Sequence, residues 1–187
     1  MTLTPSEAAA ALATIEATET RAKQLNAYRK GSPFLLLWGA IWVVGFSVED
    51  LAPQMTHTAW LTLDLIGGIA TLALVALGRQ RVNERIGNRA AQKVLALTAI
   101  SILFSFATFM LLRPRNPLAG MAFAGLELGM IYSTIGVFVG TRWMITGLGL
   151  LTLTFAGYFS LTAHYGLWMA FVCGGGLILA GLWLRRV

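Results

Sequence analysis

The sequence predicts an all-α, polytopic membrane protein: a six-transmembrane-helix bundle preceded by a cytoplasmic N-terminal amphipathic helix. Two observations support this fold class. Charged residues make up only 12% of the 187 residues, about half of the roughly 25% found in soluble domains, so too little polar surface exists to cover a water-exposed globule. Six apolar runs of about 19–23 residues follow one another, and each is long enough to cross about 30 Å of hydrocarbon.

The N-terminal segment is polar and is predicted to form a helix of its own. Thr4, Pro5 and Glu7 have the residue types and the spacing of a capping box with proline at the first helical position. Acidic residues dominate the first two-thirds of the segment and basic residues its end, an order that suits the helix dipole. We therefore expect a stable helix that begins near residue 5.

Two residues predict where this first helix ends. Gly31 is a natural C-terminal stop, and Pro33 cannot continue a helix without losing a backbone hydrogen bond. The sequence thus predicts two domains, a cytoplasmic helix over 1–31 and a transmembrane domain over 32–187.

The distribution of basic residues predicts the orientation. The transmembrane helices are expected near 33–51, 58–78, 94–112, 118–140, 143–161 and 165–184. With the N-terminus inside, the inside segments hold 12 of the 14 lysines and arginines: four in the N-terminal segment, five in the second loop, one in the fourth and two at the C-terminus. The positive-inside rule then places both termini in the cytoplasm and the bundle in the plasma (inner) membrane.

The N-terminal helix has one weakly apolar stripe at alternating spacings of three and four residues. Such a stripe binds a membrane surface poorly but suits a helical partner, either a second copy of the chain or a soluble cytoplasmic protein. The alternative is a solvated helix that lies across the cytoplasmic face of the bundle. The stripe consists of Ala8, Ala11, Ile15, Thr18, Ala22 and Leu25.

Two carboxyl groups fall inside predicted membrane segments. Glu127 lies near the middle of the fourth and Asp64 in the outer half of the second. An ionised group at such depth costs at least about 2.5–3.5 kcal/mol, so intramembrane carboxyls favour a functional hypothesis. Glu127 is a candidate proton or cation site, with a neutral carboxyl bonded to a neighbouring helix as the alternative. For Asp64, which is nearer the interface, the structural reading is favoured.

The third predicted helix has hydroxyl residues on one face, at spacings of three, four and three. They are candidates for lining a polar cavity with Glu127. The alternative is that each hydroxyl bonds a carbonyl of its own helix one turn back. These residues are Thr98, Ser101, Ser105 and Thr108.

The fourth predicted helix also has a stripe of small residues on the side away from Glu127. Small residues allow close helix packing. We expect this seam to pack within the chain, with a homodimer interface as the alternative. The seam consists of Gly125, Gly129, Ser133, Gly136 and Gly140.

No motif for phosphate binding, zinc proteolysis or a nucleophilic serine is present, and we predict no catalytic residue, cofactor or metal site. The net charge of +6 is explained by topology, so direct nucleic-acid binding is not expected. Two function classes remain. The first is a non-enzymatic sensor or scaffold in the bilayer whose N-terminal helix engages a soluble partner or self-associates. The second is a small proton-coupled transporter or channel that uses Glu127 and Asp64.

Overall fold

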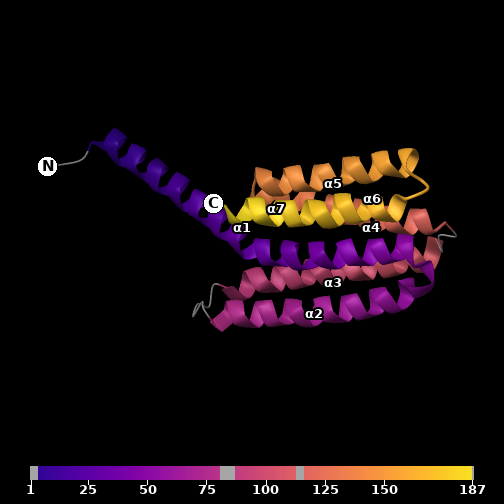
Figure 1. The fold of residues 1–187 in the computed structure, drawn as a ribbon. Coiled ribbons are helices and arrows are strands. Elements are labelled where there is room, and N and C mark those ends of the chain that lie inside the picture. The colour runs from indigo at the N-terminus through magenta and orange to yellow at the C-terminus, as the bar shows by residue number, and fades with distance from the viewer. Residues whose placement is uncertain (1–3, 81–86, 113–115, 187) are drawn as a thin grey trace.

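The computed structural model describes residues 4–80, 87–112 and 116–186, and every element in this part of the chain is helical. Figure 1 shows a bundle of roughly parallel rods from which one helix projects. The elements, in chain order, are α1 (Pro5–Leu51), a 3₁₀ turn η1 (Pro53–Met55), α2 (Thr56–Gln80), α3 (Gly87–Leu112), α4 (Pro117–Val139), α5 (Thr141–Ser160), α6 (Tyr165–Met169), a π-helical segment η2 (Ala170–Gly175) and α7 (Gly176–Arg185).

Five spans in the described residues are long and apolar enough to cross a membrane. They are α1, the run Pro53–Gly78 formed by η1 and most of α2, α4, α5 and the continuous run Tyr165–Arg185 formed by α6, η2 and α7. The described apolar part of α3, Ala99–Leu112, is shorter. The all-helical architecture and these apolar spans are those of a membrane helical bundle.

The N-terminal helix does not end at Gly31. The capping box at Thr4 and Glu7 is confirmed, but α1 runs on through Gly31 and Pro33 to Leu51, so the predicted stop is wrong. Proline in a helix interior costs about 3 kcal/mol and bends the helix rather than always ending it. Figure 1 shows this change of direction between the projecting part of α1 and the part inside the bundle.

Tertiary contacts at the bend offset the cost of the proline. The hydroxyl of Ser32 is buried and donates to the carbonyl of Gly181 at 2.7 Å. Tyr28 is buried one turn before it, and Gly31 leaves room for the indole of Trp143. We call residues 5–27 the arm, because they precede this anchored region and extend about 35 Å at 1.5 Å per residue.

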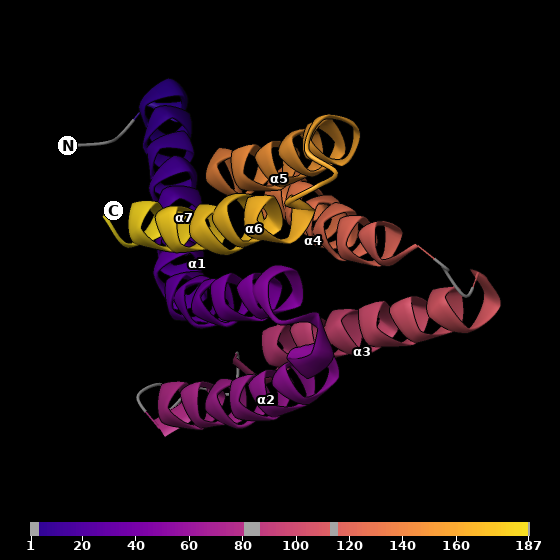
Figure 2. The same ribbon diagram turned by 45° about the vertical axis from the view of Figure 1, so that its right-hand side comes forward.

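The rest of α1 is the central helix of the bundle. It packs against α2 on one side and against α6, η2 and α7 on the other, as Figure 2 shows. The Nε1 of Trp38 donates to the hydroxyl of Thr71 at 3.1 Å and links α1 to α2. Toward α7, the backbones approach closely: a Cβ on Gly39 would lie 2.8 Å from the carbonyl oxygen of Gly174 in η2. The π-helical segment therefore lies at a close backbone contact with α1.

The small-residue seam of α4 packs against α5. A Cβ on Gly129 would lie 2.9 Å from the carbonyl oxygen of Gly147, and a Cβ on Gly125 would lie 2.6 Å from the hydroxyl of Thr154. A side chain on Gly136 would overlap the backbone of Met144. The face that was an alternative dimer interface is thus covered by α5 of the same chain.

This seam generates a stability prediction. Gly136→Ala is expected to destabilise the folded bundle by at least about 1–3 kcal/mol, because the added methyl group forces the α4 and α5 backbones apart. The measurement is the thermal unfolding midpoint of the purified protein in detergent. Gly68→Ala is the matched control, because no atom lies within 4 Å of a Cβ built on Gly68. Equal midpoints for the two variants would contradict the close packing.

Candidate functional site

Glu127 of α4 faces α3. Its Oε2 is hydrogen bonded to the Oγ of Ser105, and its Oε1 is buried with no hydrogen-bond partner in the described part of the chain. Aromatic rings pack between the same two helices. Phe123 of α4 meets Phe109 edge to face with centroids 5.3 Å apart, and it stacks on Phe104 at 6.2 Å. One carboxyl and three rings therefore join α4 to α3.

The Ser105 hydroxyl has two acceptors within reach but only one proton to donate. Its Oγ lies 2.9 Å from the carbonyl oxygen of Ser101 as well as against Glu127. When Ser105 donates to that carbonyl, the proton of the second contact must come from Glu127. A neutral Glu127 thus satisfies both contacts, whereas an ionised one competes with the Ser101 carbonyl.

The other hydroxyl residues of α3 contribute less than the sequence pattern suggests. Ser101 and Thr108 are half-buried on the same face as Ser105, while most of the described α3 residues between them are exposed. Among the described side chains only Ser105 is hydrogen bonded to Glu127. Ser105 also bonds the carbonyl of Ser101 one turn back in its own helix, as the alternative interpretation expected. The side chain of Thr98 lies outside the described residues.

Asp64 is not part of this site. It lies on an exposed face of α2, and no hydrogen bond joins it to Glu127 or Ser105 in the described residues. The neighbouring Leu61 and Leu65 are also exposed, so this face of α2 points out of the bundle. The transport hypothesis uses Asp64 and Glu127 together, and no contact between these two side chains supports that pairing.

The end of α1 is joined to α2 and to the start of α6 by polar contacts. The Nε1 of Trp60 donates to Glu49 at 3.0 Å, and the Nδ1 of His164 lies 3.3 Å from the carboxylate of Asp50. Within the described ranges no three or more His, Cys, Asp or Glu side chains gather as metal ligands would. These contacts fix the ends of the helices.

A second polar region lies where the arm meets the bundle. Gly140 ends α4 with a φ of 148°, a conformation that L side chains rarely adopt, and any side chain there would overlap Gln24 and Tyr28. The Nε2 of Gln24 donates to the hydroxyl of Tyr28 at 2.9 Å. Gly140 therefore belongs to this junction, although the sequence pattern assigned it to the α4 seam.

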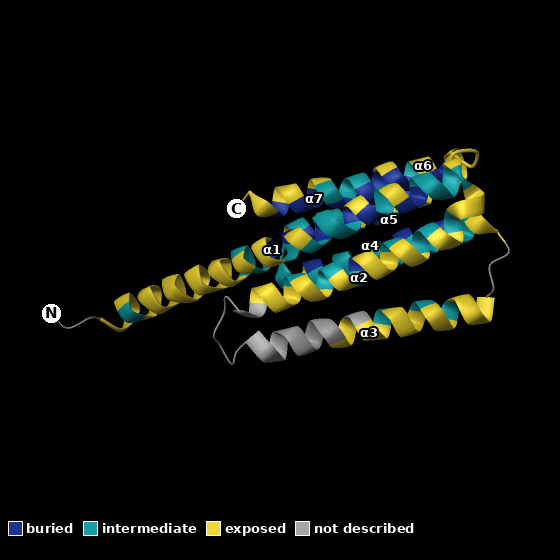
Figure 3. Cartoon of the chain, turned by 60° about the horizontal axis from the view of Figure 1, so that its bottom comes forward, coloured by how far each residue is buried: buried dark blue, intermediate teal, exposed yellow. Residues whose placement is uncertain are grey.

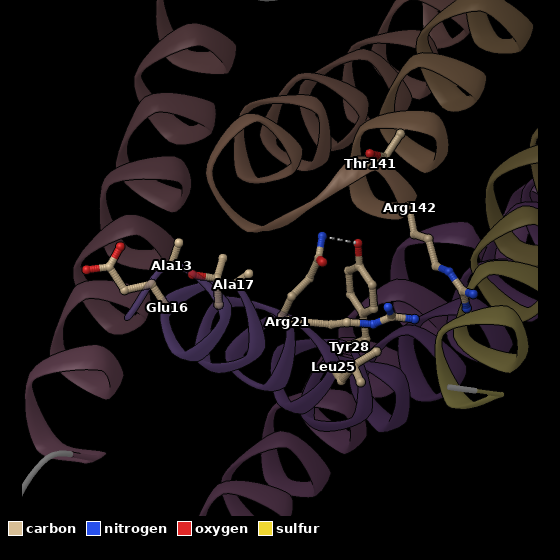
Figure 4. Close-up of a pocket in the computed structure, with 10 residues that line it drawn as sticks. Ala13, Glu16, Ala17, Arg21, Leu25, Tyr28, Thr141 and Arg142 are labelled. Atoms are coloured by element: carbon tan, nitrogen blue, oxygen red, sulfur yellow. Dashed lines mark hydrogen bonds between the residues drawn. The ribbon is translucent and has the colours of Figure 1, made fainter. Parts of the chain in front are cut away.

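A groove of about 780 Å³ opens at the junction between the arm and the start of α5. Figure 4 shows its lining, with Tyr28 and Arg142 at one end and Glu16 turned away from them. Arg142 donates from Nη1 to the carbonyl oxygen of Trp183 at 2.7 Å. Sequence reasoning counted Arg142 only as a topological charge, because nothing in its local pattern indicates the partners that tertiary folding provides.

The arm itself is largely free of the bundle. Most of its residues are exposed, as Figure 3 shows by the yellow ribbon. In the predicted stripe, Ala11, Ile15, Thr18 and Ala22 are exposed, whereas Ala8 and Leu25 are half-buried. At 100° per residue the stripe points about 140° away from the residues of α1 that line the groove. Leu25 belongs to both, but the rest of the stripe and the groove are on different faces of one helix.

Comparison of the chain with protein-family models, curated proteins and solved structures finds no match. Function is therefore inferred from the geometry of this chain.

The Glu127–Ser105 contact generates a spectroscopic prediction. The infrared spectrum of the protein in lipid is expected to contain a carbonyl band of a protonated carboxyl that Glu127→Gln removes. Ser105→Ala is expected to shift that band, because the Glu127 carboxyl loses its hydrogen-bond partner. Asp64→Asn is the control and should leave the Ser105-sensitive component unchanged. The absence of such a component at every pH tested would contradict a proton-carrying Glu127.

Proposed function

We propose that this protein is a non-enzymatic membrane sensor or scaffold whose N-terminal arm binds a soluble regulatory protein on the cytoplasmic side. The observation that carries the proposal is the continuity of α1. One helix runs from an exposed arm through a bend to the centre of the bundle. A partner on the arm is thereby connected to the transmembrane part without a flexible linker.

The arm offers a surface of the right kind. Its stripe is exposed at Ile15, which is 55% accessible, and the adjoining Leu12 is 61% accessible. Apolar side chains flanked by charges on an exposed helix suit helix-to-helix recognition more than membrane insertion. Because the stripe faces away from the groove at the junction, a partner can bind it without displacing the arm from the bundle.

The full topology, with six transmembrane helices and both termini in the cytoplasm, is part of this proposal. In its support, α3 comprises 26 residues, about 39 Å at 1.5 Å per residue, and lies beside the other rods. The arm and the C-terminus lie at the same end of the bundle in Figure 1, as an even number of crossings requires. The excess of basic residues at that end favours the cytoplasmic side of the plasma (inner) membrane.

Site-specific photo-crosslinking in native membranes tests the arm. A crosslinking amino acid at Ile15, on the stripe, is expected to give one discrete adduct with a soluble protein. The same amino acid at Ala9 is the control, because Ala9 is also exposed but lies about 150° from the mean direction of the stripe. Equal adducts from both positions, or none from either, would contradict the proposal. If the Ile15 adduct joins two copies of the chain, the arm self-associates and does not bind a soluble partner.

The structure also defines a suitable truncation. Removing residues 1–22 deletes most of the arm but keeps Gln24 and Tyr28, which contact the turn at Gly140. The truncated bundle is expected to fold with an unchanged thermal midpoint and to lose the partner. Retention of the partner by the folded truncation would show that the arm does not bind it.

A second candidate function is proton-coupled transport, and the buried, unpartnered Oε1 of Glu127 favours it. Intramembrane carboxyls of this kind are typical of proton relays. This transport proposal does not use Asp64, because Asp64 is exposed on α2. Here α3, which contacts α4 through Ser105 and a few rings, is the element that would move.

Transport has its own test. In proteoliposomes, Glu127→Gln is expected to abolish any flux that depends on a pH gradient, because an amide cannot cycle a proton. Asp64→Asn is the matched control and is expected to retain that flux. A panel of small ions and amines, with and without a pH gradient, is the measurement. Flux that is the same for Glu127→Gln and the native chain would exclude Glu127 as the coupling group.

A further inference from the structure

Two grooves of opposite character meet at Arg142. The first is the polar groove of about 780 Å³ between the arm and the start of α5. The second, of about 360 Å³, runs between α5 and α7 and includes Trp183 in its lining. Arg142 lines the first groove and donates to the backbone of Trp183, which lines the second, so its guanidinium marks the boundary between them.

The Arg142 guanidinium is held in place and still has donors to offer. Its central carbon lies 4.9 Å from the ring centroid of Trp183 and 5.7 Å from that of Tyr28. Of its five N–H donors, one is used by the Trp183 carbonyl. In the described part of the chain no carboxylate pairs with it. A fixed guanidinium with open donors is suited to phosphate oxygens.

The remainder of the polar groove supports an anionic ligand. Arg21 adds a second guanidinium from the arm, and Gln24 and Thr141 add neutral polar groups. Glu16 also lines the groove, but Figure 4 shows its carboxylate turned away from Tyr28 and Arg142. The end of the groove at Tyr28 and Arg142 is therefore basic.

The second groove is apolar and open along the helices. Its one hydroxyl side chain, Thr146, donates to the carbonyl of Arg142 on its own helix. Two glycines leave space in it: no atom lies within 4 Å of a Cβ on Gly149, and only a Leu150 methyl, at 3.8 Å, approaches a Cβ on Gly176. A volume of this size is within the range of ligand pockets, and its lining suits a hydrocarbon chain.

We propose that the two grooves together bind one anionic phospholipid, with its phosphate on Arg142 and Arg21 and one acyl chain between α5 and α7. The position fits a lipid of the leaflet at this end of the bundle, because Trp183 and Arg142 lie at the helix ends where aromatic and basic residues meet headgroups. Of the stripe only Leu25, which is half-buried, lines this site, and the site does not rest on the sensor proposal.

Native mass spectrometry of the full chain in detergent tests this site. Phosphatidylglycerol and phosphatidylcholine with identical acyl chains are titrated, so that the two lipids differ only in the headgroup, which is anionic in the first and zwitterionic in the second. The native chain is expected to bind one phosphatidylglycerol about tenfold more tightly than phosphatidylcholine, as one charge-assisted contact implies. Arg142→Gln is expected to remove this preference. Arg21→Gln is expected to reduce the preference for phosphatidylglycerol. Because Arg21 lies on the exposed arm, this variant tests the site even if Arg142→Gln lowers the yield of folded protein.

The acyl chain is tested by filling the groove. Gly149→Leu is expected to weaken both lipids about tenfold, because its side chain takes the space of the chain. Gly68→Leu is the matched control, a glycine on α2 that also has no atom within 4 Å of its Cβ. Equal binding of the two lipids to the native chain, or no effect of Gly149→Leu, would overturn the proposal. Displacement of the lipid by glycerol phosphate alone would also overturn it, in favour of a soluble phosphate ligand.

Discussion

Close contact between helix backbones at glycines is the interaction on which this bundle depends. At Gly39 and Gly174, α1 meets η2 so closely that a Cβ on Gly39 would lie 2.8 Å from a carbonyl oxygen. At Gly129 and Gly147, α4 meets α5 at a similar distance. Lipid tails are as apolar as leucine side chains, so helices in a membrane gain little from hiding apolar surface and associate through this kind of packing. The glycine contacts fix α1, α4, α5, α6 and α7 as one unit, whereas α2 and α3 present most of their described surface outward (Figure 3).

The same packing explains why Pro33 does not end α1. A proline in a helix interior removes one backbone hydrogen bond, which is a local cost. Around it, Ser32 is bonded to Gly181, and Gly31 accommodates Trp143. These contacts require the helical path to continue into the bundle, so the chain bends instead of breaking. The bend also directs the arm toward the start of α5 and creates the groove that Tyr28 and Arg142 line.

Sequence patterns predicted features that depend on one helix at a time and missed those that depend on two. The capping box at Thr4 is local and is confirmed. Helical periodicity put Ser105 on a polar face, and that face is the one turned to Glu127. The predicted stop at Pro33 was wrong because contacts with α5 and α7 decide whether the helix continues. For Asp64 the sequence indicates a depth in the membrane, but depth does not indicate which way the side chain faces around α2. The stacking of Arg142 between Tyr28 and Trp183 joins three segments far apart in the chain, and no local signal indicates it.

The helix α4 connects the two polar regions of the molecule. One side of it carries Glu127 against Ser105, the other packs on α5, and its end at Gly140 touches Gln24 and Tyr28 at the base of the arm. Between these two regions α4 makes close backbone contacts with α5 at Gly129 and Gly136. Coupling between distant sites requires an element with two arrangements that both sites bias. In this fold α4 contacts both regions, so any coupling between the Glu127–Ser105 contact and the arm would have to pass through α4.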